Sequence, residues 1–346
     1  MTSFLGLATN VPVPCYSQRE IFEQLQELNL TTDPRAEIIF EKAGVGFRHT
    51  VVERSYFAEE RTTQTRNACY FSHAVPLGES TVRACLQNAG YESADVDDLI
   101  IVSCTGIDTP GLDLQLAGRL GMRPDLHRTT ILGMGCYAAF PGLLRAREAT
   151  ALQPGRKALV LTIELCSLHL QMDESLENMV ACALFADGAS AALLGTNGTT
   201  TAGPRLLDSL THCEYNTLEH MAFHLTDHGF QMRLSAYVPD LLAADIENFV
   251  DRLLHKNQLT RQDIRFWGVH PGSSKILDHV QERLQLTDDD MSISRRVLHD
   301  YGNMSSATIL FILEQIIASD APRPGDYGVL MAFGPGLTME SALLQF

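Results

Sequence analysis

The sequence lacks the features that mark membrane proteins and nucleic-acid-binding proteins. No uncharged apolar run approaches the length that spans a bilayer, and no basic stretch precedes the apolar residues at the N-terminus. Basic residues are scarce, since 26 Lys and Arg face 42 Asp and Glu, for a formal net charge of −16. An acidic surface of this kind repels nucleic acid and anionic membranes, so we expect a cytoplasmic protein with neither partner.

Paired cysteines and flexible linkers are also missing. The eight cysteines are scattered without a C-x-x-C pair, which argues against a zinc ribbon or a disulfide framework and favours reduced thiols. No stretch rich in Pro, Gly or Ser separates independent domains. With 346 residues and 45% hydrophobic content, the chain can bury a large core, and we expect two structurally similar halves.

Short apolar runs alternate with longer helical patterns along the chain, which is typical of an α/β protein. The predicted strands are Asp98–Ser103, Arg128–Leu132, Ala158–Ile163, Ala189–Leu194, Ile264–Val269 and Gly328–Phe333. The predicted helices include Gly78–Ala89, Leu112–Leu120, Cys136–Leu152, Tyr237–Leu254, Ser274–Leu284 and Ser305–Ile317. A glycine-containing turn opens an apolar helix both before Cys136 and after Tyr301, and this repetition suggests duplicated halves.

Cys136 stands directly after a predicted strand and at the first turn of a predicted helix, in Leu132-Gly-Met-Gly-Cys-Tyr-Ala-Ala-Phe-Pro-Gly. Free backbone amides and the positive end of the helix dipole stabilise a thiolate there, so we expect the pKa of this thiol to be lowered. Small neighbours such as Gly135 and Ala138 leave room for a bulky thioester. The alternative is an inert buried cysteine, which is the common state of this residue type. The position favours an acylation site.

Two residues in the second half of the chain are candidates to assist Cys136. His270 ends the predicted strand Ile264–Val269 and precedes Pro-Gly, so its ring could face a pocket and hold a thiolate. Asn303, in Tyr301-Gly-Asn-Met-Ser-Ser, either caps a helix or donates its amide to a developing oxyanion. Both functions are compatible with one asparagine.

The order of Cys136, His270 and Asn303 resembles that of the thiolase-like condensing enzymes. Several other segments are similar to one branch of that group, the chalcone-synthase-like type III polyketide synthases. These segments are Cys104-Thr-Gly-Ile-Asp-Thr-Pro-Gly-Leu-Asp, Ala183-Leu-Phe-Ala-Asp-Gly-Ala, His270-Pro-Gly, Gly302-Asn-Met-Ser-Ser and Phe333-Gly-Pro-Gly-Leu-Thr-Met-Glu. Together they extend the resemblance over essentially the whole chain.

The resemblance implies an α/β protein with a thiolase-like fold in a duplicated, five-layer αβαβα architecture. An N-terminal half over residues 1–204 would carry the nucleophilic cysteine, and a C-terminal half over residues 205–346 would carry the histidine and asparagine. The enzyme would be a homodimeric, decarboxylating acyltransferase that uses coenzyme A esters as substrates and needs neither another cofactor nor a carrier protein.

In the reaction implied by the resemblance, Cys136 accepts an acyl group from a starter acyl-CoA. His270 and Asn303 then stabilise the enolate formed when malonyl-CoA loses carbon dioxide, which requires no essential carboxylate. The extended chain cyclises to a pyrone, a resorcinol or another aromatic polyketide, and the sequence does not identify the starter, the number of extensions or the product. A ketoacyl-carrier-protein synthase of the fatty-acid-initiating type is the main alternative, and a non-catalytic member of the same fold is another.

The resemblance also assigns cavity positions. Phe185 would be the gatekeeper between tunnel and cavity, and Met232 stands at the second gatekeeper position, where plant members carry an aromatic residue. The other expected cavity residues are Cys104, Thr105, Thr109, His169, Phe223 and Ser305. Among them, Thr109 is expected to reach into the neighbouring subunit. Cysteines at the positions of Cys104, Cys166 and Cys182 occur in the tetrahydroxynaphthalene-forming subgroup.

Coenzyme A carries phosphates, which need positive charge at the tunnel entrance. By resemblance, Arg35, Lys42 and Lys275 are the candidate partners, with ordinary solvated surface charge as the alternative. His220, His224 and His228 recur every four residues, but in a strand region this spacing separates their rings too far for one ion. We therefore expect no metal site.

Overall fold

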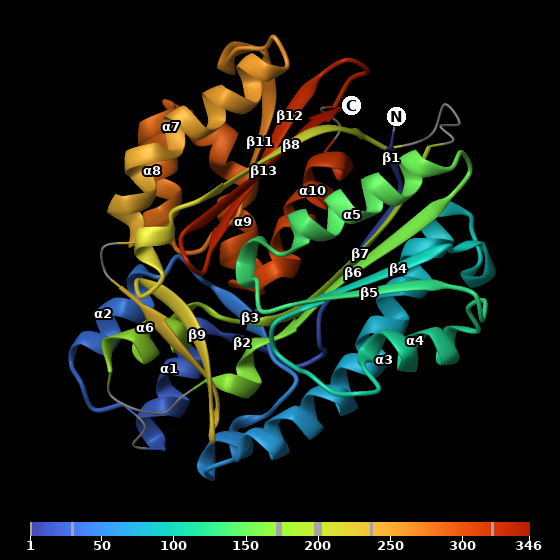
Figure 1. Ribbon diagram of the computed structural model, residues 1–346. Coiled ribbons are helices and arrows are strands. Elements are labelled where there is room, and N and C mark those ends of the chain that lie inside the picture. Colours follow the sequence, from blue (N-terminus) through green and yellow to red (C-terminus); the bar gives the residue numbers. More distant parts are fainter. Residues whose placement is uncertain (1, 29–30, 171–174, 197–202, 236–237, 320–321) are drawn as a thin grey trace.

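The computed structural model describes residues 2–28, 31–170, 175–196, 203–235, 238–319 and 322–346. Among these residues, nine strands form one mixed sheet in which five strands of the N-terminal half adjoin four of the C-terminal half (Figure 1). In sheet order the strands are β5 (His127–Leu132), β4 (Asp98–Ser103), β6 (Lys157–Leu165), β7 (Asp187–Gly195), β1 (Ser3–Asn10), β8 (Arg205–Cys213), β13 (Thr338–Gln345), β12 (Tyr327–Gly334) and β11 (Ile264–Val269). The two groups meet where Ser3 on β1 pairs with Arg205 on β8.

Both groups of strands repeat one pairing pattern. In the N-terminal group β4 pairs with β6 in parallel, whereas β6 with β7 and β7 with β1 are antiparallel. In the C-terminal group β11 pairs with β12 in parallel, whereas β12 with β13 and β13 with β8 are antiparallel. β5 is an additional parallel strand beside β4 at the outer edge. This repetition is consistent with duplicated halves.

Helices on both sides of each group of strands complete five layers. The helices of these layers are α3 (Thr63–Ala89), α4 (Leu112–Leu120), α5 (Ala139–Leu152), α7 (Val238–Lys256), α8 (Ser274–Leu284), α9 (Asp288–Tyr301) and α10 (Thr308–Ala318). α3 and α4 share one buried apolar cluster with the N-terminal strands, α5 and α10 share a second cluster between the two groups, and α7 and α8 share a third with the C-terminal strands (Figure 1). The expected layered α/β architecture is confirmed.

The residue pattern of each helix reflects its layer. α10 reads TILFILEQIIA and buries residues around most of its circumference, because strands and helices surround it in the central layer. α9 instead buries Met291, Ser294, Val297 and Leu298, which lie on one face. No helix in the described part of the chain combines the length and the apolar character needed to span a membrane.

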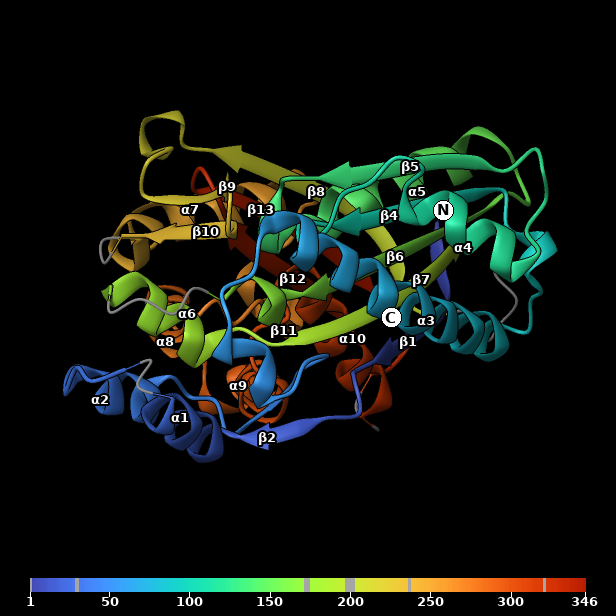
Figure 2. The same cartoon turned by 90° about the horizontal axis from the view of Figure 1, so that it is seen from below.

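Several shorter elements lie together at one end of the molecule, at the lower left of Figure 1, and Figure 2 shows the same group from below. They are β2 (Cys15–Ser17), α1 (Gln18–Glu27), α2 (Arg35–Lys42), β3 (Phe47–His49), α6 (Leu176–Leu184), β9 (Met221–Thr226) and β10 (Gly229–Leu234). β9 and β10 form an antiparallel hairpin, and β2 pairs with β3. These elements supply much of the wall of the candidate site.

The predicted strands and helices all exist, and their bounds differ by a few residues in most cases. The largest difference is at α3, which begins at Thr63 rather than at the predicted Gly78. The helix continues through Pro76, a residue type that usually marks a helix start or break. The helix predicted from Tyr237 is described from Val238, and Tyr237 lies outside the described residues. The helix predicted from Cys136 begins instead as a short 3₁₀ turn, Gly135–Tyr137, ahead of α5.

Candidate active site

Cys136 lies where the two halves of the molecule meet. β5 ends at Leu132, and the chain turns through Gly133 and Gly135, both with positive φ near 70°, into the 3₁₀ turn that carries Cys136. A Cβ at Gly135 would lie 2.6 Å from the ring of Pro335, in the loop after β12. Glycine is therefore required both for the backbone conformation and for the close approach of the C-terminal half.

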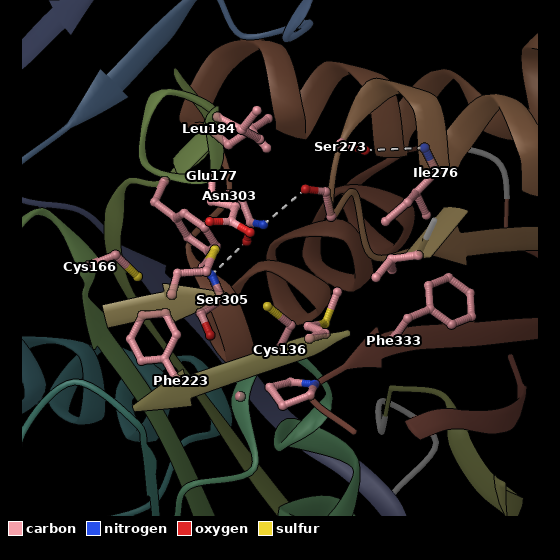
Figure 3. A pocket seen from close by; sticks show the side chains of 18 of the residues that line it. Cys136, Cys166, Glu177, Leu184, Phe223, Ser273, Ile276, Asn303, Ser305 and Phe333 are labelled. Carbon is pink, nitrogen blue, oxygen red and sulfur yellow. Dashed lines mark hydrogen bonds between the residues drawn. The ribbon is translucent and has the colours of Figure 1, made fainter. Parts of the chain in front are cut away.

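The sulfur of Cys136 lies at the wall of a cavity that Ser305 and Asn303 also line (Figure 3). Hydrogen bonding to Ser305, to Asn303 and to the backbone at Cys136 lowers the pKa of the thiol, but burial and the negative charge of Glu164 raise it by more, to about 12. The expectation that the pKa of this thiol is lowered is therefore wrong. Loss of water around the sulfur outweighs the effect of the helix start.

The side-chain amide of Asn303 is oriented by two neighbours. Its Oδ1 accepts a hydrogen bond from the Ser305 amide at 2.9 Å, and its Nδ2 donates to the carbonyl of Gly272 at 3.3 Å (Figure 3). Asn303 thus stabilises the local turn that leads into Ser305–Ala307 and does not cap α10 itself. Because Nδ2 has two hydrogens, the second remains for the Cys136 sulfur or for a substrate oxygen.

His270 follows β11 and is completely buried. Its backbone amide donates to the Met331 carbonyl at 2.8 Å, but neither imidazole nitrogen has a hydrogen-bond partner among the described residues. Burial lowers the pKa of His270 to about 3, so the ring is neutral. An unpartnered buried polar group costs about 1–3 kcal/mol, and such groups are found where chemistry requires them.

The ring of His270 lies directly behind the cavity wall. Gly272 lines the cavity in front of Cys136, and a Cβ at Gly272 would lie 4.0 Å from Cδ2 of His270. His270 itself is not among the lining residues. The imidazole of His270 therefore lies close to Gly272 in the cavity wall.

A buried carboxyl group, Glu164 on β6, connects to the same site. Its oxygens accept hydrogen bonds from the Cys104 amide at 3.0 Å, the Thr105 hydroxyl at 2.9 Å and the Ser306 hydroxyl at 2.5 Å. Burial raises the pKa of Glu164, and these hydrogen bonds oppose the increase. The site therefore includes a buried carboxyl group that the sequence-based reaction scheme left out, although a lone Glu in the apolar strand β6 was a signal for it.

Cys104 lies between Glu164 and the surroundings of Cys136. Its sulfur lies 3.4 Å from both carboxyl oxygens of Glu164 and 3.6 Å from the hydroxyl of Ser305. Hydrogen bonding to Ser305 also lowers the pKa of Cys136, so polar groups connect the Glu164 carboxyl group with the sulfur of Cys136. The pKa of the Cys104 thiol is raised by burial and by Glu164, which keeps this second sulfur protonated.

The cavity in front of Cys136 has a volume of about 660 Å³ and a mainly apolar lining. Of the residues expected around it, those that line it are Cys104, Thr105, Cys136, Phe185, Phe223, Met232, Asn303 and Ser305. Cys166 also lines it, whereas Cys182 lines a small adjacent cavity. Thr109 and His169, two of the expected cavity residues, do not line the cavity of this single chain.

His169 lies one layer behind the cavity wall. Its Nε2 bonds the carbonyl of Thr105 at 2.7 Å, and its Nδ1 accepts the amide of Phe230 at 3.3 Å. Burial lowers the pKa of His169 to about 4, so this ring is neutral. Its ring also meets that of Phe230 edge-on, with centroids 4.9 Å apart. His169 therefore supports the wall rather than forming it.

Phe230 lines the cavity and was not among the expected residues. Its ring stacks on that of Phe223, with centroids 5.9 Å apart and an interplanar angle of 25°. Phe230 and Met232 are two residues apart on β10, so they share one face of the strand. The alternation of side chains along this strand was the signal in the sequence for Phe230, which places an aromatic ring on the same face as Met232, the residue expected at the second gatekeeper position.

Two of the three expected phosphate partners line the cavity. Lys42, at the end of α2, and Lys275, in the first turn of α8, are both exposed lining residues. The Ser274 hydroxyl donates to the Lys42 carbonyl at 2.8 Å, which holds these two helix ends together. Arg35 does not line the cavity, because its guanidinium pairs with Asp33 at the surface.

The three histidines at four-residue intervals do not form a cluster of possible metal ligands. Among the described residues, the one group of three close ligands consists of His212, Glu214 and Asp245, with ligand atoms within 4.8 Å of one another. None of the three lines the cavity in front of Cys136. This group therefore has no connection with the candidate active site.

Comparisons with known proteins give a consistent result. The chain matches the family models for chalcone and stilbene synthases, the N-terminal domain over residues 4–198 and the C-terminal domain over residues 210–346. It is 34% identical to 1,3,6,8-tetrahydroxynaphthalene synthase from Streptomyces peucetius subsp. caesius, over 100% of this chain and 93% of that protein. It is 33% identical to 3,5-dihydroxyphenylacetyl-CoA synthase from Amycolatopsis orientalis, over 100% of this chain and 94% of that protein.

A solved structure has the same fold. The crystal structure of 1,3,6,8-tetrahydroxynaphthalene synthase from Streptomyces coelicolor A3(2), described as a bacterial type III polyketide synthase, matches with a TM-score of 0.93. The match covers 99% of each chain at 27% sequence identity. Similarity of sequence and of structure thus extends over the whole length.

Proposed function

This chain belongs to the chalcone and stilbene synthase family and is a type III polyketide synthase, and on that basis we propose that Cys136 carries the growing acyl chain. The observation that supports this role best is the pair of donors near it. His270 has an imidazole with no partner among the described residues, and Asn303 has an amide hydrogen left for the site. Asn303 lines the cavity, and His270 lies just behind Gly272 in its wall.

The first step is acylation. The sulfur of Cys136 attacks the carbonyl of an acyl-CoA thioester, and its proton passes to an unpartnered nitrogen of His270. The carbon–sulfur bond to coenzyme A then breaks, and the departing thiolate takes the proton from His270. The imidazole is neutral and its ring nitrogens have no partner among the described residues, so a nitrogen is free to hold this proton during the attack.

The second step is decarboxylation and condensation. The bond between the malonyl carboxylate and the α-carbon breaks, carbon dioxide leaves, and the electron pair moves to the thioester oxygen as an enolate. Neutral N–H donors from His270 and Asn303 stabilise this developing charge. The α-carbon then attacks the acyl group on Cys136, forms the new carbon–carbon bond and releases the sulfur.

Coenzyme A esters are the proposed substrates, without a carrier protein. Lys42 and Lys275 lie together at the cavity, and Lys275 is in the first turn of α8, where free backbone amides also favour an anion. They are the proposed phosphate partners. Arg35, held by Asp33, is proposed only as a more distant contributor.

We further propose a homodimer in which Thr109 approaches the cavity of the partner. β4 and β5 are adjacent parallel strands, so the loops after them lie at one edge of the sheet. These loops and the end of β5 expose Ile107, Leu132 and Met134, which are 54%, 40% and 38% exposed. A second copy would cover these apolar side chains. A cytoplasmic location is part of the same proposal and is supported by the eight cysteines, all in the described part of the chain and none in a disulfide.

The proposed products are cyclised polyketides of the pyrone, resorcinol or other aromatic type. A cavity of about 660 Å³ gives an extended chain room to fold, and its largely apolar wall shields reactive intermediates from water. The relatives named above are named for aromatic products.

The experiment is an assay of malonyl-CoA alone and with a panel of acyl-CoA starters, read by carbon dioxide release and by mass spectrometry of products. We expect polyketides from the wild type and none from Cys136→Ala, which should fold normally because the change removes only the sulfur. Activity that requires malonyl carrier protein would contradict the proposal, as would product formation by Cys136→Ala.

A further inference from the structure

Arg48, on β3, is the largest fully buried side chain among the described residues, with 1% of its surface exposed. Removing a guanidinium from water costs several kcal/mol unless hydrogen bonds and charges compensate, so its partners are informative. Arg48 does not line the cavity in front of Cys136. It lines a small neighbouring cavity of about 40 Å³, and Phe185 lines both cavities. Arg48 thus lies on the far side of the gatekeeper.

The partners of Arg48 are the carbonyl groups at the end of α6. Its Nη1 donates to the carbonyls of Cys182 and Phe185, the latter at 3.1 Å, and its Nη2 donates to Oε1 of Gln18 at 2.8 Å. Gln18 in turn donates to the Ala183 carbonyl at 2.8 Å. The last carbonyls of a helix have no partner within the helix, and here two side chains satisfy three of them.

The remaining carbonyl at this helix end binds the segment that carries Asn303. The Leu184 carbonyl accepts the Asn303 amide at 2.9 Å, and the Ala186 amide donates to the Asn303 carbonyl at 2.9 Å. Phe185 and Asn303 therefore pair as a short parallel bridge. A Cβ at Gly302 would lie 2.9 Å from Cγ of Arg48, so the stem of Arg48 also packs against this segment.

The positive charge of Arg48 is favourable at the carboxyl end of α6. Burial lowers the pKa of Arg48 to about 10, while attraction to Asp187 raises it, so the guanidinium stays positive at neutral pH. A positive charge at the carboxyl end of a helix is favourable, because the helix dipole is negative there. Asp187 is itself held by the Ser167 amide at 2.8 Å and the Val51 amide at 2.7 Å.

We propose that Arg48 is a positioning residue for the condensing reaction, which fixes the end of α6 and thereby holds Phe185 and Asn303 in register with each other. This inference rests on the proposed function. It predicts that loss of Arg48 shifts the Asn303 amide and impairs malonyl decarboxylation. Acylation of Cys136 should change less, because the turn that carries Cys136 packs against the loop at Pro335 instead.

The test compares Arg48→Met and Arg48→Lys with the wild type in two assays. Acylation of Cys136 is followed by intact mass after mixing with an acyl-CoA, and decarboxylation by carbon dioxide release from malonyl-CoA. For Arg48→Met we expect decarboxylation to fall by about 30- to 100-fold and acylation to change by less than about 3-fold, since small displacements of an oriented donor have large effects on rate. Arg48→Lys, which keeps the charge, should recover part of the loss.

Val82→Ala is the matched control for stability. Val82 is fully buried in the outer layer formed by α3, away from the cavity, and its truncation also destabilises the fold. It should leave the ratio of the two rates unchanged. If Arg48→Met does not fold, Gln18→Ala should show a smaller loss in the same assay, because it removes one support of the same helix end.

Equal loss of both activities, in proportion to the loss of stability in Val82→Ala, would overturn the inference, as would wild-type decarboxylation in Arg48→Met. Failure of the proposed function is distinguishable from either result. In that case the wild type itself would neither acylate Cys136 nor release carbon dioxide.

Discussion

Two buried polar side chains behind the wall of the candidate site differ in their hydrogen bonding. Glu164 accepts hydrogen bonds from the Cys104 amide and from the hydroxyls of Thr105 and Ser306. His270 is equally buried, yet its two ring nitrogens have no partner within the described part of the chain. Glu164 is therefore integrated into the fold, whereas the ring nitrogens of His270 are left for the proposed chemistry.

This difference shows that, within one site, some buried polar groups contribute to stability and others are retained for activity. A satisfied buried group strengthens the structure, and its removal leaves donors without acceptors. An unpartnered group weakens the structure, and its retention indicates a function that outweighs the cost. Substitutions at the two positions should consequently have opposite signatures.

The largest expected effect is loss of activity at His270. His270→Leu removes the proposed base and enolate donor, and we expect carbon dioxide release from malonyl-CoA to fall by about 1000-fold or more. The free energy of unfolding should rise by about 1 kcal/mol, because an unpartnered polar group is replaced by an apolar one. Urea denaturation measures this, and His270→Gln is the polar control. A clear loss of stability in His270→Leu would contradict the comparison.

Glu164→Leu should show the opposite signature. Its hydrogen-bond donors, among them the Cys104 amide and the hydroxyls of Thr105 and Ser306, would lose their acceptor, so we expect the free energy of unfolding to fall by about 3 kcal/mol. Urea denaturation at neutral pH checks this value. Glu164→Gln, which keeps one acceptor oxygen, should lose less. Unchanged stability in Glu164→Leu would show that these hydrogen bonds contribute little.

Glu340, on β13, is an intermediate case because its carboxyl oxygens share one donor, the hydroxyl of Thr211, at 2.9 Å. Burial raises the pKa of Glu340 from 4.5 to about 7. Because the pKa is raised on folding, its favourable contribution is complete below about pH 4.5 and is lost as the pH rises through 7. Relative to wild type, Glu340→Gln should therefore gain about 3 kcal/mol in the free energy of unfolding between pH 4.5 and 8. A constant difference across this range would exclude titration of Glu340 as the cause.

The smallest expected effect concerns the charge of Glu164 rather than its hydrogen bonds. Its negative charge raises the pKa of Cys136, so Glu164→Gln should lower that pKa and increase the rate of iodoacetamide alkylation at pH 8 by about 3-fold. Intact mass measures the rate, and alkylation of Cys136→Ala gives the background from other thiols. A slower reaction in Glu164→Gln would mean that the carboxyl group assists the sulfur instead.

Local patterns in the sequence were sufficient for many elements. The bounds of β4, β11, α4 and α8 follow from apolar runs and helical periodicity, and they match the structure residue by residue. β1, β8 and β13 were not predicted, although they join the two groups of strands. Their pairing connects segments about 200 residues apart at Ser3 and Arg205, and no local pattern records such a contact.

The sequence by itself determined the family, the layered architecture and the three residues of the proposed reaction, because motifs and periodicity are local properties. Only the tertiary structure decided the surroundings of those residues. It raised the pKa of Cys136, left His270 without a partner among the described residues, and placed Glu164 and Arg48 behind the cavity wall. Burial and hydrogen bonding depend on contacts between distant segments, and they set the charge and orientation of each group.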